Sequence, residues 1–179
     1  MIPLIKRAES VAAVAGQHAD AVDKAASFPA EAIASMKANG LLGAMIPVEF
    51  GGEGASLAQI AEVCACISQQ CASSGMIYAM HQIKASSVIS HGKDAPWHQD
   101  FMRKIAKNQW LLGSATTEGG IGGDLRNSIC AVEVTGDQFH LEKDATVISY
   151  GAQADAILVT ARRAPDAASN DQVMIVGLK

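Results

Sequence analysis

The stretch Leu112-Gly113-Ser114-Ala115-Thr116-Thr117-Glu118-Gly119-Gly120-Ile121-Gly122-Gly123-Asp124 marks the change from helical to β patterning in this chain. Five glycines fall within the eleven residues from Gly113 to Gly123. Glycine permits positive φ and lets a ligand approach backbone N–H groups closely. The stretch is no P-loop, because no Gly-Lys-Ser/Thr follows, and no Rossmann fingerprint, because no βαβ pattern surrounds it. It predicts a strand followed by a ligand-binding loop, or else by an ordinary flexible turn.

The residues before this stretch carry helical signals. Apolar side chains at helical spacing predict a helix over residues 4–27, and Pro29 suits the first turn of a second helix that ends with Gly40 as a left-handed cap. Ser56 is a predicted N-cap. Further helices are expected over residues 57–70, 76–90 and 96–107, with a break at residues 73–75. Met76, Met80 and Ile83 share one helix face and are expected in the core.

The residues after it have β character. Ile129 to Val134 and Ala156 to Ala161 are apolar runs of strand length, and Gly136-Asp137 predicts a hairpin turn. The predicted fold class is α+β, with an all-α domain over residues 1–108 and an antiparallel, β-barrel-like domain over residues 109–179. Because the sequence stops one residue after an apolar strand, we expect a truncated sheet.

Composition limits the classes of function. The 179 residues are 49% hydrophobic and carry a net charge of −4. No block of Lys or Arg exceeds two residues, which argues against a nucleic-acid partner. No apolar run reaches the ~18 residues of a membrane span. Four cysteines without a secretion signal indicate a cytoplasmic protein with reduced thiols, and their spacing suits no zinc site. We therefore assign no metal ligands.

Four ordered segments carry a resemblance. Residues 115–118, followed by Gly120, Gly122 and Asp124, resemble the Thr-Glu-Pro-x-x-Gly-Ser-Asp signature of the acyl-CoA dehydrogenase family. Residues 40–52 resemble its Gly-Leu…Pro-Glu-Tyr-Gly-Gly loop, and residues 109–113 its Gly-Glu-Trp lead into the next strand. Residues 145–155 resemble its Lys-x-Trp-Ile-Thr-Asn-Gly…Ala-Asp segment. The chain departs from these patterns at Gly119, Gly123 and Val147, where the family has Pro, Ser and Trp.

The resemblance implies a flavoprotein that binds FAD and desaturates an acyl-CoA thioester, passing electrons to an external acceptor. The implied FAD-binding residues lie in two segments, one after the predicted strand and one near residue 148: Ser114, Ala115, Thr116, Thr117, Gly122, Gly123, Val147, Ile148 and Ser149. It also implies a homo-oligomer. The family's catalytic glutamate lies in a C-terminal helical bundle that this sequence lacks, and Glu118 is a structural part of the loop, so the catalytic residue is unknown.

His81 is the one candidate for a catalytic side chain that the residues themselves offer. A neutral imidazole on a mostly apolar helix can line an active site, but it can equally be held by a backbone carbonyl. Two alternative functions stay open: a flavin-dependent monooxygenase of the same fold, in which His81 would act near the flavin, and a catalytically incomplete fragment.

Overall fold

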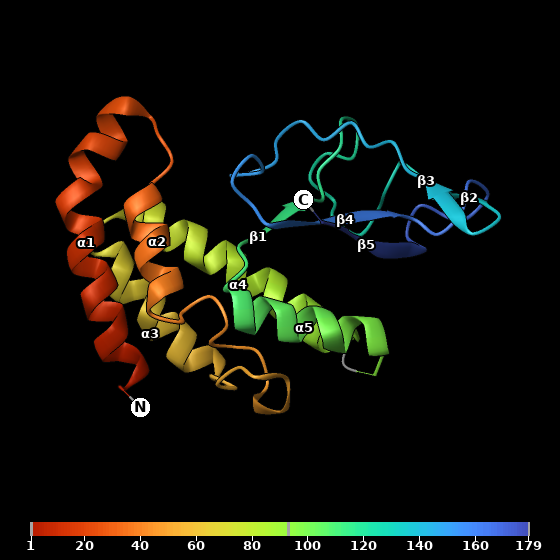
Figure 1. Ribbon diagram of the computed structural model, residues 1–179. Helices are drawn as coiled ribbons and strands as arrows, with labels where there is room; N and C mark the ends of the chain where they lie inside the picture. Colours follow the sequence, from red (N-terminus) through yellow and green to blue (C-terminus); the bar gives the residue numbers. More distant parts are fainter. Residues whose placement is uncertain (1, 93, 179) are drawn as a thin grey trace. The chain divides into compact units, whose positions relative to one another are not determined.

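The computed structural model describes residues 2–92 and 94–178, which belong to two compact units, residues 1–111 and residues 112–179 (Figure 1). Unit 1 is helical, and unit 2 contains all the strands that the described residues form. The predicted α+β class is thereby confirmed. No helix among the described residues has the length and apolarity needed to cross a membrane.

In residues 2–92 and 94–111, unit 1 consists of five α-helices and one short 3-10 helix. They are α1 (Leu4–Ala25), α2 (Ala30–Ala38), η1 (Val48–Phe50), α3 (Leu57–Ser68), α4 (Ala72–Gly92) and α5 (Pro96–Asn108). Helix α1 packs against α2 and α3, α3 against α4, and α4 against α5. The face of α1 that enters the core is made largely of small side chains, which lets neighbouring helices approach closely: Ala8, Val11, Ala12 and Ala15.

Local signals set the start of α3 and the end of α2. Ser56 Oγ accepts from Gln59 N (3.3 Å) while Gln59 Oε1 accepts from Ser56 N (2.9 Å), a complete capping box at the start of α3. Gly40 has φ +69° just beyond α2, as predicted for a left-handed cap.

The predicted break at residues 73–75 is wrong. These residues form the first turn of α4, and the chain bends earlier, over residues 69–71. Gly75 lies so close to Ser68 that an added Cβ would meet its Cα at 2.9 Å, and this approach is why glycine occurs inside a helix.

Over residues 112–178, unit 2 contains one three-stranded sheet and one hairpin. The sheet has the order β1 (Leu112–Ala115), β4 (Ala156–Arg162), β5 (Gln172–Leu178). Strands β2 (Glu133–Thr135) and β3 (Gln138–His140) form the predicted hairpin around Gly136, whose φ is +61°. The run predicted as a strand from Ile129 is shorter, because only Glu133–Thr135 pairs along the hairpin.

The three-stranded sheet is mixed rather than wholly antiparallel. Strand β5 runs antiparallel to β4, but β1 runs parallel to it, with Leu112 opposite Ala156 and Ala115 opposite Val159. The antiparallel arrangement predicted from the sequence is therefore wrong for this pair. Parallel pairing needs a long crossover, which the forty residues between β1 and β4 supply.

Candidate functional site

The glycine-rich stretch forms an open loop directly after β1. Ser114 and Ala115 are the last residues of the strand, and the remaining predicted contacts of this segment follow in the loop: Thr116, Thr117, Gly122 and Gly123. Gly120, Gly122 and Gly123 have φ of +92°, +60° and +85°, and the last two have nothing within 4 Å of an added Cβ. These conformations are costly for residues with a side chain, so the loop depends on its glycines.

The backbone donors of this loop are free. Among residues 2–92 and 94–178, no hydrogen bond is donated by the backbone N–H groups of residues 116–123. Thr116 and Thr117 are half-buried, whereas Gly122 and Gly123 are exposed. The loop thus offers several N–H groups and two hydroxyls to a ligand rich in acceptors, such as a phosphate or the edge of a heterocyclic ring.

The second predicted segment leads into β4. Val147 is 67% exposed and Ile148 is 37% exposed, and Ser149 follows them half-buried. Tyr150 has φ +44°, and its hydroxyl donates to Leu112 O over 3.0 Å, which ties this segment to β1. Burial raises the pKa of Tyr150. The result is a bare apolar surface at Val147 and Ile148, held in place by a tyrosine.

The sheet brings parts of the two segments together. Ala115 and Ile148 line the same hollow of about 320 Å³ on unit 2, with Ile157 and Val159 of β4. Glu118 and Gly119 line a different hollow, with Ile129, Cys130 and the acidic residues Glu142 and Asp144. The end of β1 therefore borders a largely apolar hollow, whereas the loop itself borders one that is lined in part by acidic side chains.

Glu118 is a buried anchor of the loop. Its carboxylate accepts from Ile129 N (2.9 Å) and Cys130 N (2.8 Å) and forms an ion pair with Lys143 Nζ (3.1 Å). Burial by itself raises the pKa of Glu118, but the hydrogen bonds from Cys130, Ile129 and Lys143 outweigh it and lower the pKa from 4.5 to about 2. The structural role expected for Glu118 follows from this geometry.

Because its pKa is lower in the folded than in the unfolded chain, Glu118 stabilises the fold fully above about pH 4.5 and loses this contribution as pH falls towards 2. We expect the difference in free energy of unfolding between wild type and Glu118→Gln to be largest near pH 6 and to shrink steadily below pH 4.5. Urea unfolding between pH 2.5 and 6, followed by circular dichroism, measures this difference, with the exposed Glu142→Gln as control. A difference independent of pH would contradict the assignment.

His81 lies in the interior of unit 1. It is 0% exposed, and Nε2 lies 2.7 Å from Leu42 O. Since a carbonyl only accepts, Nε2 carries the hydrogen. The neighbouring Gln82 Nε2 donates to Leu41 O over 2.9 Å. The side chains of His81 and Gln82 thus hold the carbonyls of Leu42 and Leu41 in the loop after α2. This geometry supports a structural role for His81. A catalytic role for it stays a prediction.

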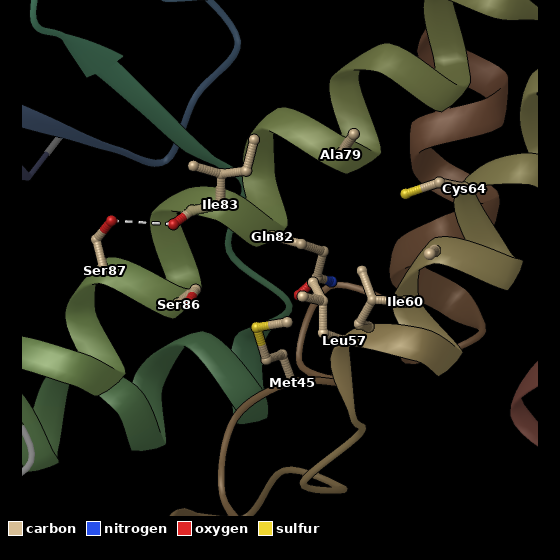
Figure 2. Close-up of a pocket in the computed structure, with 10 residues that line it drawn as sticks. Met45, Leu57, Ile60, Cys64, Ala79, Gln82, Ile83, Ser86 and Ser87 are labelled. Atoms are coloured by element: carbon tan, nitrogen blue, oxygen red, sulfur yellow. Dashed lines mark hydrogen bonds between the residues drawn. The ribbon is translucent and has the colours of Figure 1, made fainter.

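A pocket of about 460 Å³ opens between α3, α4 and the preceding loop of unit 1 (Figure 2). Its walls are largely apolar, and Ser87 on the rim donates to Ile83 O over 3.0 Å. Met76 and Ile83 are 60% and 65% exposed, so the prediction that they belong to the core is wrong. They stand on the outer face of α4. The lining residues are Met45, Leu57, Ile60, Ala61, Cys64, Ala79, Gln82, Ile83, Ser86 and Ser87.

Comparison with known proteins decides the family. Residues 6–109 match the family described as "Acyl-CoA dehydrogenase, N-terminal domain". This chain belongs to the acyl-CoA dehydrogenase family. It is 29% identical over 144 residues to cyclohex-1-ene-1-carbonyl-CoA dehydrogenase of Syntrophus aciditrophicus, covering 80% of this chain and 35% of that protein. It is 28% identical over 145 residues to 3-(aryl)acrylate reductase of Clostridium sporogenes, covering 80% of this chain and 38% of that protein.

Solved structures agree on the fold. FMN-bound TdsC from Paenibacillus sp. A11-2 superimposes with a TM-score of 0.85 at 20% identity, over 98% of this chain and 44% of that one. The chain thus spans less than half the length of these two relatives and of the matching structure. The predicted resemblance to the family is confirmed.

Sequence reasoning missed Lys143, Tyr150 and Gln82. Lys143 stands between Glu142 and Asp144, a pattern typical of a solvated surface, so its side chain gave no sign of being buried. Tyr150 takes a left-handed backbone conformation that favours Gly or Asn, and nothing in its own sequence signals that. The side chains of all three residues donate hydrogen bonds to backbone carbonyls distant in the chain, and Lys143 also pairs with the carboxylate of Glu118. Such partners can be identified only from the folded structure.

Proposed function

We propose that this protein is an FAD-dependent oxidoreductase of the acyl-CoA dehydrogenase type, and that its reaction is the α,β-desaturation of an acyl-CoA thioester. The observation that carries the proposal is the loop of residues 116–123, whose backbone donors are all free within the described chain. The names of its relatives, a CoA-thioester dehydrogenase and an acrylate reductase, support a reaction at a carbon–carbon bond next to a carbonyl.

The residues present fit the cofactor. FAD has a pyrophosphate and a ring edge rich in acceptors, which match the open N–H groups and the hydroxyl of Thr117. The ring also has a flat apolar face, which matches the exposed side chains of Val147 and Ile148. The hydroxyl of Ser149 follows directly, and in this proposal it donates near N5 of the ring.

When bound, FAD supplies a two-electron acceptor for hydride. The chain's own residues do the rest of the work that unit 2 can perform. Thr117 and the loop N–H groups bind and orient the ring edge and stabilise negative charge there, while Val147 and Ile148 exclude water from its face. The hydroxyl of Ser149 donates a hydrogen bond near N5 of the ring.

Glu118 takes no part as a base. Its oxygens already accept two backbone N–H groups and face Lys143, and its lowered pKa makes it a poor proton acceptor. We assign no catalytic base among the described residues. The proposed partners are an acyl-CoA substrate, an electron-transfer acceptor and further copies of the chain, in the cytoplasm.

The first test is flavin binding. Purified chain is mixed with FAD and desalted, and a retained visible absorption band is the expected result. Gly122 and Gly136 form a matched pair, because both have φ near +60° and both have open space around an added Cβ. Alanine therefore costs a similar backbone strain at either position, but only position 122 lies in the loop. We expect Gly122→Ala to weaken FAD binding about ten-fold more than Gly136→Ala.

The outcomes separate the candidate functions. A flavin band that acyl-CoA bleaches under anaerobic conditions supports desaturation. Oxygen consumption that depends on reduced flavin and is unaffected by acyl-CoA supports the monooxygenase alternative. A colourless chain, or equal effects of the two alanines, contradicts the proposal that this loop is a flavin site and favours the catalytically incomplete fragment.

A further inference from the structure

Lys143 is the point at which three separate parts of unit 2 meet. Its Nζ lies 3.1 Å from Glu118 Oε2 in the loop after β1 and donates to Thr160 O of β4 over 2.8 Å. It also lies 3.7 Å from Cys130 Sγ, and Cys130 N is one of the donors that hold Glu118. The side chains of Lys143 and Glu118 are each 5% exposed. A lysine is rarely so deeply buried unless a partner compensates its charge.

The two segments predicted to contact the flavin are positioned by the pairing of β1 with β4 and by side chains near them. In the part of the chain that the structure describes, no backbone hydrogen bond joins residues 114–123 to residues 144–151. Two side-chain links join these ranges or the residues next to them. Tyr150 ties the second segment to Leu112, and Lys143, one residue before that segment, ties it to Glu118 inside the loop.

The charges of this junction also matter for an anionic ligand. Glu118 places a buried carboxylate within a loop whose other groups are donors suited to negative charge. Lys143 is the cation that faces this carboxylate. Without it, the carboxylate would oppose a pyrophosphate bound to the same loop, and only the backbone N–H groups of Ile129 and Cys130 would offset its burial.

We propose that Lys143 is a positioning residue for the flavin site: it locks the loop of residues 116–123 to the segment of residues 144–149 and neutralises Glu118. The inference rests on the function proposed above. Lys143 touches no reacting atom in this scheme. It acts through Glu118, which in turn fixes the loop at the amides of Ile129 and Cys130.

The test is a double-mutant cycle on the full chain with Lys143→Met, Glu118→Gln and the double variant. The readouts are the dissociation constant of FAD, measured by quenching of flavin fluorescence, and hydrogen exchange at the amides of Ile129 and Cys130 without FAD. We expect Lys143→Met to weaken FAD binding about ten-fold or more and to speed exchange at both amides. The double variant should bind FAD at least about five-fold more tightly than the product of the two single effects predicts.

Arg163→Met is the control, because Arg163 pairs with Asp171 at the same 3.1 Å, but its side chain is 61% exposed. It should leave both readouts unchanged. If Lys143→Met does not fold, the double variant, which leaves no uncompensated buried charge, still gives the comparison with Glu118→Gln. Equal FAD binding by Glu118→Gln and the double variant, both weaker than wild type, supports a junction that acts as a unit, whereas unequal binding by these two variants overturns the inference.

Three results would count against the proposals. If wild type binds FAD and Lys143→Met binds it equally well, the positioning role fails while the proposed function stands. If the single effects simply multiply in the double variant, Lys143 does not act through Glu118, and the inference is overturned. If wild type binds no FAD at all, the proposed function fails and takes the inference with it.

Discussion

Replacing Gly52 by alanine should lower the free energy of unfolding of unit 1 by about 3 kcal/mol. An added Cβ at this position would meet Ile46 O, and the nearest carbon would be the backbone carbonyl carbon of Ile46 at 2.5 Å. Both atoms belong to the backbone of the loop between α2 and α3. That loop is closed on itself, because Gly52 N donates to Pro47 O (3.2 Å) and Gly54 N to Ile46 O (2.9 Å). Backbone atoms held in this way cannot move aside as the end of a flexible side chain could.

Gly51→Ala is the matched control for this prediction. Gly51 has φ +86° but a free approach, with only Ala106 Cβ at 3.9 Å, so alanine there should cost about 1 kcal/mol of backbone strain. Both tryptophans of the chain, Trp97 and Trp110, lie in unit 1, and their fluorescence during urea unfolding therefore reports on that unit alone. Equal losses for the two alanines would mean that the close contact with Ile46 does not exist in solution.

His81→Leu should destabilise unit 1 by about 2 kcal/mol, because it leaves the buried carbonyl of Leu42 without the donor at 2.7 Å. Leucine fills a similar volume, so the loss reports mainly on the missing hydrogen bond. The measurement is again urea unfolding followed by tryptophan fluorescence. His91→Leu, on the exposed end of the same helix, should change the free energy of unfolding by less than about 0.5 kcal/mol.

The same variant separates the two interpretations of His81. If His81 is structural, the variant should have a lower urea midpoint, and the chain that remains folded below that midpoint should keep its turnover when loaded with flavin. A catalytic histidine predicts an unchanged midpoint with loss of turnover in the flavin-loaded protein. The burial of His81 and its contact with Leu42 lead us to expect the first result.

Local physics explains what could be predicted. Ser56 with Gln59, and Gly40 beyond α2, act on neighbours within four residues, so their capping roles are written in the sequence itself. The glycine-rich loop could also be predicted from local sequence, because the ability to adopt positive φ is a property of single residues. The four motif segments, read in order, gave the family, which the match over residues 6–109 confirms. The predicted FAD contacts stay a prediction.

The remaining features depend on partners far apart in the chain. His81 meets Leu42 across 39 residues, and Lys143 meets Thr160 across 17, and no local pattern announces either contact. The same holds for the direction of β1 beside β4, because apolar alternation is identical in parallel and antiparallel strands. The sequence by itself thus determined the helices, the open loop and the family. Only tertiary structure decided the strand direction and which polar side chains are buried, since both depend on long-range pairing of backbone and charge.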